Sequence, residues 1–353
     1  MRKIVNFLDI GRKTLQVNMG SKCRIPISMH IWLTNRCPNA CVYCQVHKLP
    51  QNDFWNTDAL IEVLSETKGC GTRRIHFTGG EPMLRGDIRE IIERSKNMGF
   101  FTSLITSGYQ VSKRADELRS ADIVYVSYDG PGEIQNNLRR GISSGDVELA
   151  LKALKEEAIP VWTVTVLTRL NMEYIEDIVA FARKYNVVAN FSMLNFSGNA
   201  ETYFRPYLNE IRELLMNSEE RKGCLQKLIK MKRSGYPIGS SFAYLQNALE
   251  WAHDDRVTSP MKAKEYRCWA GRAYGYIDAS GILYACSSHF LRNLGKDVTQ
   301  KGFRAAWEDL PLLKDCQSCL SPSGMENNLV FSLNYRNILS RCVQLHRMGA
   351  LKG

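Results

Sequence analysis

The sequence lacks the long apolar run of a transmembrane helix, since no uninterrupted hydrophobic stretch reaches the roughly 18 residues needed to cross a bilayer. Its first ten residues also lack the apolar core of a secretory signal. There is no internal repeat and no low-complexity tract. With 44% hydrophobic and 24% charged residues, the composition excludes collagen-like and broadly disordered chains. We therefore expect a folded cytoplasmic protein, and its 353 residues suggest two structural units or one large unit with an appendage.

The 11 cysteines are too few for a disulfide scaffold in a chain of this length, and their odd number excludes complete pairing. In a reducing compartment, closely spaced cysteines are more often metal ligands or catalytic groups, whereas isolated cysteines are usually small buried side chains. Seven fall into two groups: Cys37, Cys41 and Cys44, and then Cys268, Cys286, Cys316 and Cys319. Four stand alone, and we expect them to be packed or partly exposed free thiols: Cys23, Cys70, Cys224 and Cys342.

Basic residues exceed acidic ones by 47 to 36, which gives a formal net charge of +11. They are dispersed and lack the aromatic interleaving of a nucleic-acid-binding module, so no nucleic-acid partner is expected. A solvated basic surface is the simpler interpretation. Local basic clusters, such as the one between positions 227 and 233, could instead meet phosphate, carboxylate or an anionic membrane surface.

From residue 26 to about residue 197, β-rich apolar runs alternate with amphipathic segments, which indicates repeated βα units and a parallel sheet. Strands are expected at residues 28–33, 74–78, 102–106, 123–128, 161–167 and 188–194. Helices are expected at residues 57–67, 87–98, 113–119, 146–157 and 172–184. Six units are fewer than the eight of a closed barrel, so the α/β fold is expected to be a partial (βα)6 TIM-like barrel or a doubly wound sheet. In either, the chemistry lies at the carboxyl ends of the strands.

The remaining segments are assigned by composition. Residues 1–27 are expected to form a helical extension that covers the open end of the sheet or lies on a membrane surface. After the barrel (28–200), the expected units are a helical linker (201–260), a small cysteine-rich unit (261–325) and a C-terminal helix (326–353). A β-hairpin is predicted where 274–278 and 282–286 flank a turn ending in Gly281, because glycine accepts the positive φ of a tight turn.

The first cysteine group lies within eight residues, directly after the first expected strand. Three thiolates on one loop can hold a four-iron cluster and leave one iron open to another ligand. A zinc site completed by His47 is the alternative that the spacing leaves open.

The C-x3-C-x2-C spacing, with Tyr43 before the last cysteine, resembles the defining motif of the radical SAM superfamily. Further similarity lies in Phe-Thr-Gly-Gly-Glu-Pro at 77–82, which matches the family's GGEP motif after the second strand. The segments 105–108 and 126–130 end the third and fourth strands as ribose-contacting segments do in that family. The segment 136–141 resembles its arginine-glycine stretch, although it has two asparagines where histidine-aspartate is usual.

This resemblance implies that the first cysteine group binds a [4Fe-4S] cluster, whose open iron binds S-adenosylmethionine. One electron from the reduced cluster would then release a 5'-deoxyadenosyl radical, which abstracts hydrogen from carbon. The implied contacts to S-adenosylmethionine are Tyr43, Gly79, Gly80, Glu81, Ser107, Ser127, Asp129 and Arg140. Arg140 is implied to pair with the carboxylate of this cofactor.

The second cysteine group resembles the C-terminal twitch or SPASM extension of radical SAM enzymes, with Gly281 five residues before Cys286. The full SPASM pattern continues with closely spaced cysteines, whereas here Cys342 follows Cys319 by 23 positions. The shorter twitch version is the better match, and it implies a second, fully ligated [4Fe-4S] cluster that assists electron transfer or substrate positioning. From the residues alone, a four-cysteine zinc ribbon is the alternative.

The expected function is that of a radical SAM enzyme acting on a small-molecule, sugar, phosphorylated or lipid-linked substrate, as an oxidoreductase, epimerase or transferase. No evident peptide-leader-binding or cobalamin domain precedes residue 28, so a peptide-modifying SPASM-type enzyme is the alternative. A non-catalytic, metal-stabilised RNA-binding or scaffold protein is a third hypothesis. Flavodoxin or ferredoxin would serve as electron donor, and peripheral membrane contact is an open expectation. His289 is a candidate acid or base, and Cys224 a candidate hydrogen donor.

Overall fold

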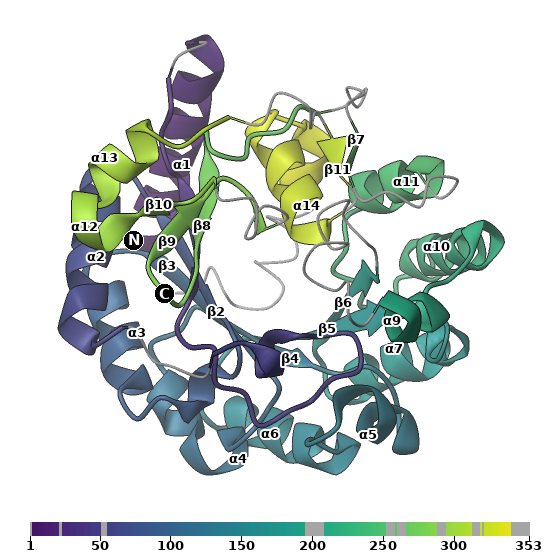
Figure 1. The fold of residues 1–353 in the computed structure, drawn as a ribbon. Coiled ribbons are helices and arrows are strands. Elements are labelled where there is room, and N and C mark those ends of the chain that lie inside the picture. The colour runs from purple at the N-terminus through teal and green to yellow at the C-terminus, as the bar shows by residue number, and fades with distance from the viewer. Residues whose placement is uncertain are drawn as a thin grey trace.

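The computed structural model describes residues 2–20, 23–50, 55–194, 208–251, 258–259, 266–287, 294–312, 318–319 and 321–339. Its centre is a nine-stranded sheet of order β10-β9-β8-β1-β2-β3-β4-β5-β6 (Figure 1). Six strands pair in parallel in chain order: β1 (Ser28–Trp32), β2 (Arg74–Thr78), β3 (Phe101–Thr106), β4 (Ile123–Ser127), β5 (Val161–Leu167) and β6 (Val188–Met193). A doubly wound sheet reverses its strand order at a switch point. The uninterrupted order of β1 to β6 therefore confirms the partial barrel.

The helices form an outer ring around these strands (Figure 1). Those of the barrel are α2 (Thr57–Gly69), α3 (Ile88–Asn97), α4 (Val111–Arg114), α5 (Glu133–Arg139), α6 (Ser144–Glu156) and α7 (Ile175–Lys184). Short 3-10 turns accompany them: η1 (Val46–Lys48), η2 (Pro82–Leu84), η3 (Ala115–Leu118) and η4 (Met172–Tyr174). Local signals define several ends; α6 begins with a capping box in which Ser143 and Asp146 satisfy each other's backbone N–H groups.

Side chains along the barrel strands alternate between two environments. On β1 and β2, Met29, Ile31, Ile75 and Phe77 are at most 1% exposed because they face the helices. The residues between them, such as His30 and His76, are only half-buried. Since successive strand residues point to opposite faces, the half-buried row faces the interior of the barrel.

The C-terminal region joins the same sheet. Strands β8 (Tyr274–Ile277) and β9 (Ile282–Tyr284) form the predicted hairpin, with Gly281 at a φ of 82°, and β10 (Lys296–Asp297) pairs with β9. Strand β8 pairs in parallel with β1, so the hairpin extends the barrel sheet instead of forming a sheet of its own. A separate two-stranded sheet joins β7 (Thr258–Ser259) to β11 (Ser318–Cys319).

Helices of the C-terminal half complete the molecule: α9 (Leu208–Leu214), α10 (Ser218–Arg233), α11 (Phe242–Trp251), α12 (Val298–Lys301), α13 (Phe303–Glu308) and α14 (Pro322–Phe331). Helix α14 bridges the two sides of the incomplete barrel. Its Glu326 Oε1 accepts a hydrogen bond from Ser241 N, beyond β6 (2.8 Å), and its Asn328 Oδ1 accepts one from Trp269 N, before β8 (2.9 Å). The gap left by six strands is thus occupied by a helix.

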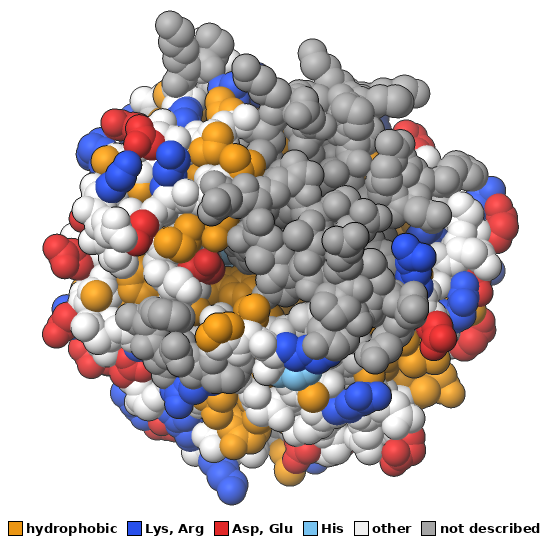
Figure 2. All heavy atoms as spheres, in the orientation of Figure 1, with side chains coloured by type: hydrophobic (Ala, Val, Ile, Leu, Met, Phe, Trp, Pro, Cys, Tyr) orange, Lys and Arg blue, Asp and Glu red, His pale blue; other side chains and the backbone are white. Residues whose placement is uncertain are grey.

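The N-terminal helix α1 (Arg2–Met19) lies against the amino ends of β2 and β3. Asp9 forms an ion pair with Arg73, and Asn6 Nδ2 donates to Gly99 O at 2.8 Å. Among the described residues, no helix combines the length and the apolar character needed to cross a bilayer. On the face shown in Figure 2, Lys and Arg side chains are interspersed with Asp and Glu around the periphery, as expected of a solvated charged surface.

Candidate active site

The first cysteine loop leaves β1 beside the GGEP segment that follows β2. Gly80 N donates to Thr34 O and Glu81 N donates to Arg36 O, both at 2.8 Å, so the β1–β2 pairing continues beyond the strands. A Cβ atom on Gly80 would lie 2.1 Å from Arg36 O, and one on Gly79 would lie 2.4 Å from Thr34 O. Both glycines are therefore needed for close backbone contact with the cysteine loop.

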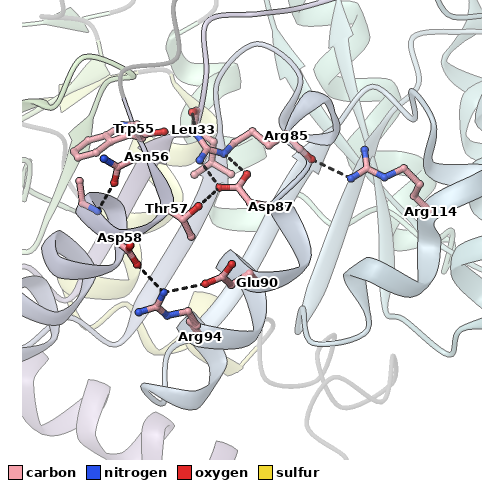
Figure 3. A network of polar contacts seen from close by, with 11 residues as sticks. Leu33, Trp55, Asn56, Thr57, Asp58, Arg85, Asp87, Glu90, Arg94 and Arg114 are labelled. Atoms are coloured by element: carbon pink, nitrogen blue, oxygen red, sulfur yellow. Dashed lines mark hydrogen bonds and ion pairs between the residues drawn. The ribbon is translucent and has the colours of Figure 1, made fainter.

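Arg85, three residues after Pro82, holds both ends of the segment that contains the three cysteines (Figure 3). Its Nη1 donates to Leu33 O at 3.1 Å and to Trp55 O at 3.0 Å, and its Nε donates to Asp87 Oδ1 at 2.8 Å. The Arg85 side chain is only 5% exposed. A buried guanidinium has donors enough to satisfy several acceptors at once, so one side chain fixes the start and the end of the loop.

Glu81 links the end of β2 to the end of β3. Its fully buried carboxylate accepts hydrogen bonds from Thr106 Oγ1 (2.7 Å), Ser107 N (2.7 Å), Ser107 Oγ (2.6 Å) and Met83 N (3.0 Å). Burial raises the pKa of Glu81, although these hydrogen bonds oppose the shift. The Glu81 carboxylate of the GGEP motif thus joins the ends of β2 and β3 through buried hydrogen bonds. Direct contact of Glu81 or Ser107 with S-adenosylmethionine stays a prediction.

A second buried charge, Asp129, fixes the far side of the loop from the end of β4. Its carboxylate accepts from Arg139 Nε (2.7 Å), from Val166 N (2.8 Å) and from the Tyr43 hydroxyl. The guanidinium of Arg139 also lies 5.6 Å from the centre of the Tyr43 ring. Burial raises the pKa of Tyr43 well above its usual value, so the hydroxyl stays protonated and donates to Asp129. In the structure, Tyr43 and Asp129 thus contact each other.

The end of α5 contacts the loop through its backbone as well. Ala40 N donates to Arg140 O and Val42 N donates to Leu138 O, both at 2.9 Å, and Cys41 Sγ lies 3.4 Å from Arg139 O. The arginine-glycine stretch therefore meets the cysteine loop directly.

Two adjacent arginines end this helix in different environments. Arg140, the residue that the family resemblance selects, is exposed at the helix end with a φ of 39°. Arg139 is buried and paired with Asp129, and sequence reasoning missed it. The sequence signal for Arg139 was helical spacing, because Gln135 lies four residues earlier and therefore on the same face of α5. In the structure, Gln135 Oε1 accepts a hydrogen bond from Asp129 N at 2.7 Å. The role of Arg140 toward S-adenosylmethionine stays a prediction.

The three thiols lie along the loop in a largely water-excluded environment. Burial raises the pKa of Cys37 to about 12 and that of Cys41 to about 11, and it also raises the pKa of Cys44. Such thiols need a bound metal to become thiolates at neutral pH. Beside them, the side-chain amide of Asn39 is buried with no hydrogen-bond partner among the described residues. Three thiols fit the three-cysteine ligand set of a [4Fe-4S] cluster, and the unpaired amide N–H is a hydrogen-bond donor for a cluster sulfur.

The alternative of a zinc site completed by His47 makes a different geometric demand. Zinc lies about 2.3 Å from each sulfur, so its ligands must converge on one point. Within the part of the chain that the structure describes, no group of three His, Cys, Asp or Glu side chains is placed to hold one ion. The thiols of a four-iron cluster bind separate irons, so they need not converge on one point.

The second cysteine group is only partly described. Cys268 and Cys286 are half-buried on either side of the β8–β9 hairpin and pack against the core. Cys319 lies in β11, with its backbone opposite Thr258, whereas Cys316 lies outside the described residues. The auxiliary cluster stays a prediction.

Of the two candidate catalytic residues, the structure describes only Cys224. His289 falls outside the described residues. Cys224 is buried on α10, with its Sγ 3.6 Å from Met216 Sδ, and burial raises its pKa to about 11. This is the environment of a thiol packed in the hydrophobic core.

Two histidines inside the barrel were not selected from the sequence. His30 and His76 are register partners on β1 and β2, and their ring centres lie 5.1 Å apart. The signal was present, because each histidine is the third residue of an expected strand and so belongs to the same row of side chains.

Comparisons with known proteins agree with this geometry. Residues 31–182 match the model of the radical SAM superfamily. Among solved structures, Streptococcus suis SuiB bound to precursor peptide SuiA has a TM-score of 0.66 at 14% identity, over 82% of this chain and 66% of SuiB. Native anSMEcpe with bound AdoMet and Cp18Cys peptide has a TM-score of 0.60 at 16% identity, over 90% of this chain and 99% of anSMEcpe.

These structural likenesses show a shared fold, and the chain spans just under two thirds of the length of SuiB in the peptide complex. The matched domain family implies a [4Fe-4S] cluster and S-adenosylmethionine. Residues 31–182 thus form a domain of the radical SAM superfamily.

Proposed function

We propose that this enzyme modifies a peptide substrate by S-adenosylmethionine-dependent radical chemistry. In this proposal, Cys37, Cys41 and Cys44 bind the first [4Fe-4S] cluster. A second cluster is bound by the other cysteine group: Cys268, Cys286, Cys316 and Cys319. The cluster and S-adenosylmethionine supply, when bound, a radical that removes a hydrogen atom from carbon. Flavodoxin or ferredoxin is the proposed electron donor.

The observation that carries the proposal is the anchoring of the cysteine loop at the ends of β1, β2 and β4. Arg85, Glu81 and Asp129 hold this loop and its neighbours through buried hydrogen bonds. Ser107 and Ser127 follow paired positions on β3 and β4, which places them side by side at the same end of the sheet. They are our candidates for hydrogen bonds to the ribose, and Gly79 and Gly80 for close approach to the methionyl amine.

A peptide substrate is favoured by the solved structures with the same fold. SuiB is described with a precursor peptide, and anSMEcpe with a Cp18Cys peptide. These findings support the peptide alternative better than the small-molecule, sugar or lipid-linked substrates expected from the sequence. The deuterium-transfer test below distinguishes those substrates from a peptide.

The radical chemistry is tested first without any substrate. Protein reconstituted anaerobically with iron and sulfide is mixed with dithionite and S-adenosylmethionine, and 5'-deoxyadenosine is measured by chromatography. We expect Cys41→Ala to abolish this product, because it removes a cluster ligand. The matched control is Cys70→Ala, which removes a half-buried thiol outside the loop. Equal product from Cys41→Ala and the unchanged protein would contradict the cluster assignment.

The substrate class is tested by deuterium transfer. A panel of short synthetic peptides with deuterium at their carbon positions is incubated with the reconstituted enzyme. We expect deuterium in 5'-deoxyadenosine and a changed peptide mass. Deuterium transfer from sugar or lipid-linked compounds, with none from the peptides, would assign the enzyme to the small-molecule class instead.

A further inference from the structure

A cavity of about 360 Å³ lies at the amino end of the barrel, and we call it the arginine cavity. One wall belongs to the barrel, because Pro26 precedes β1 and Cys70 ends α2 just before β2. Helix α13 supplies the other wall. The lining residues are Arg24, Pro26, Cys70, Arg304, Trp307 and Glu308. The cysteine loop leaves the carboxyl end of β1, so the arginine cavity lies at the opposite end of the same strand.

The guanidinium of Arg24 is held in place by uncharged partners. Its Nε donates to Gly271 O at 2.8 Å, and its Nη1 donates to the backbone oxygen of Glu308 at 3.1 Å. Its central carbon lies 5.4 Å from the centre of the Trp307 ring. The remaining nitrogen, Nη2, is buried with no hydrogen-bond partner among the described residues. No hydrogen-bonded carboxylate of the described chain therefore neutralises the charge of Arg24.

Positive charge exceeds negative charge around the arginine cavity. Arg304 is exposed on α13 and forms no ion pair or hydrogen bond with another residue that the structure describes. Burial lowers the pKa of Arg24 and the nearby Arg272 lowers it further, whereas Glu308 opposes this shift. Glu308 supplies the one carboxylate among the lining residues, against two guanidinium groups. A cleft with such an excess concentrates anions from solution.

The half-buried thiol of Cys70 lies on the barrel wall of the cavity and can report on this charge. Burial raises the pKa of Cys70, and Glu66 and Glu308 raise it as well, whereas Arg304 opposes the shift. The carboxylate of Glu66 is already engaged, since it accepts a hydrogen bond from Phe303 N at the start of α13. Arg304 therefore lies within electrostatic reach of the thiol, although the two come from opposite walls.

We propose that the arginine cavity binds a phosphate group, with Arg304 as its hydrogen-bond donor and Arg24 as a fixed positive charge in the wall. Guanidinium groups match the geometry of phosphate oxygens, and the several oxygens of one phosphate can be reached from both walls. The cavity is within the size range of small-molecule sites, so it has room for a free phosphate ion or a small phosphate monoester. This site goes beyond the proposed radical chemistry and does not rest on it.

The first test compares two alkylating reagents of similar size at Cys70, the anion iodoacetate and the neutral iodoacetamide. Both rates are measured by mass spectrometry of peptides from the reconstituted full-length enzyme. Their ratio is independent of the thiol pKa, because both reagents react with the same thiolate. We expect Arg304→Gln to lower the iodoacetate-to-iodoacetamide ratio by about threefold, because attraction of the anion is weakened. The matched control is Arg233→Gln, which removes an exposed arginine at the end of α10 and should keep the ratio.

The second test adds inorganic phosphate, with sodium chloride of the same ionic strength as reference. We expect phosphate to slow alkylation of Cys70 by iodoacetamide by about twofold or more in the unchanged enzyme and in Arg233→Gln, but not in Arg304→Gln. Glycerol 3-phosphate distinguishes the two sources of the phosphate group. Protection at a lower concentration than inorganic phosphate indicates a phosphate monoester, and equal or weaker protection indicates the free ion.

An unchanged reagent ratio in Arg304→Gln, or no protection by either phosphate compound, would overturn the inference. Protection that persists in Arg304→Gln would place the phosphate group elsewhere and would overturn it as well. Because Arg304 is exposed, we expect this variant to fold, and circular dichroism checks that it does. The radical chemistry is read separately as 5'-deoxyadenosine, so its failure would leave these results unaffected.

Discussion

The two cysteine regions are attached to the barrel in different ways. The first cysteine loop is held by buried charged side chains, chiefly Arg85 and the Asp129–Arg139 pair. The C-terminal hairpin is held by backbone pairing of β8 with β1. Charged networks depend on a few atoms in fixed positions, whereas backbone pairing is distributed over many residues. Single substitutions should therefore damage the first region far more than the second.

Trp55 makes a further contact between the two regions. Trp55 offers its carbonyl oxygen to Arg85 at the end of the cysteine loop, and its Nε1 donates to Asp278 O in the hairpin turn at 3.3 Å. A Cβ atom on Gly281 would lie 3.4 Å from the Trp55 ring, so ring and turn are in close contact. Trp55 therefore links the end of the cysteine loop to the hairpin turn.

The largest expected effect comes from Arg139→Met, which leaves the fully buried Asp129 carboxylate without its cation. Removing one partner of a buried pair should lower the free energy of unfolding by about 3–5 kcal/mol. Chemical denaturation and iron analysis measure this, and we expect the first cluster to be lost. Arg140→Met is the matched control and should leave stability nearly unchanged. The family resemblance also predicts that Arg140→Met raises the S-adenosylmethionine concentration needed for half-maximal cleavage.

The next largest effect is expected for Arg85→Met, whose partner Asp87 is more exposed than Asp129. Losing hydrogen bonds to Leu33 O and Trp55 O releases both ends of the loop, at a cost of about 2–3 kcal/mol. Arg94→Met serves as control because Arg94 forms exposed ion pairs with Asp58 and Glu90 on the same side of the barrel (Figure 3). Equal iron loss in Arg85→Met and Arg94→Met would show that Arg85 does not hold the two ends of the cysteine loop.

Gly80→Ala probes the backbone contact between the GGEP segment and the loop. The new Cβ atom would meet the carbonyl oxygen of Arg36, and such overpacking costs about 1–3 kcal/mol. Gly86→Ala is the control, since nothing lies within 4 Å of its added Cβ. We expect thermal unfolding to shift for Gly80→Ala alone. An unshifted Gly80→Ala would mean that the contact relaxes freely.

The smallest effect is expected for Trp55→Phe, which keeps a ring against the hairpin turn and removes the hydrogen bond to Asp278 O. We expect a loss of about 1 kcal/mol in the free energy of unfolding. Hydrogen exchange at backbone amides should rise in the β8–β9 turn while the amides of α5 keep their protection. Uniform exchange across both regions would instead show that the two regions unfold as one unit.

Much of the barrel follows from local sequence patterns. The six strands begin and end within one residue of the expected positions, because each is a short apolar run between turn residues. The hairpin at Gly281 was likewise predictable from its turn chemistry. Other features were not predictable: α14 in the gap of the barrel, and β8 beside β1, join segments more than 80 residues apart in sequence. No local pattern encodes such contacts.

By itself, the sequence determined the strands, the spacing of the cysteine groups and the radical SAM motif, because these depend on residues close together in the chain. The tertiary structure decided which of two adjacent arginines is buried, since a helix turns by a fixed angle and only Arg139 points at Asp129. It also decided that His30 and His76 share a surface with Tyr125, because strand register and sheet curvature bring rings from separate strands together. The spacing of the first cysteine group predicts metal chemistry, and the fold shows how its loop is held.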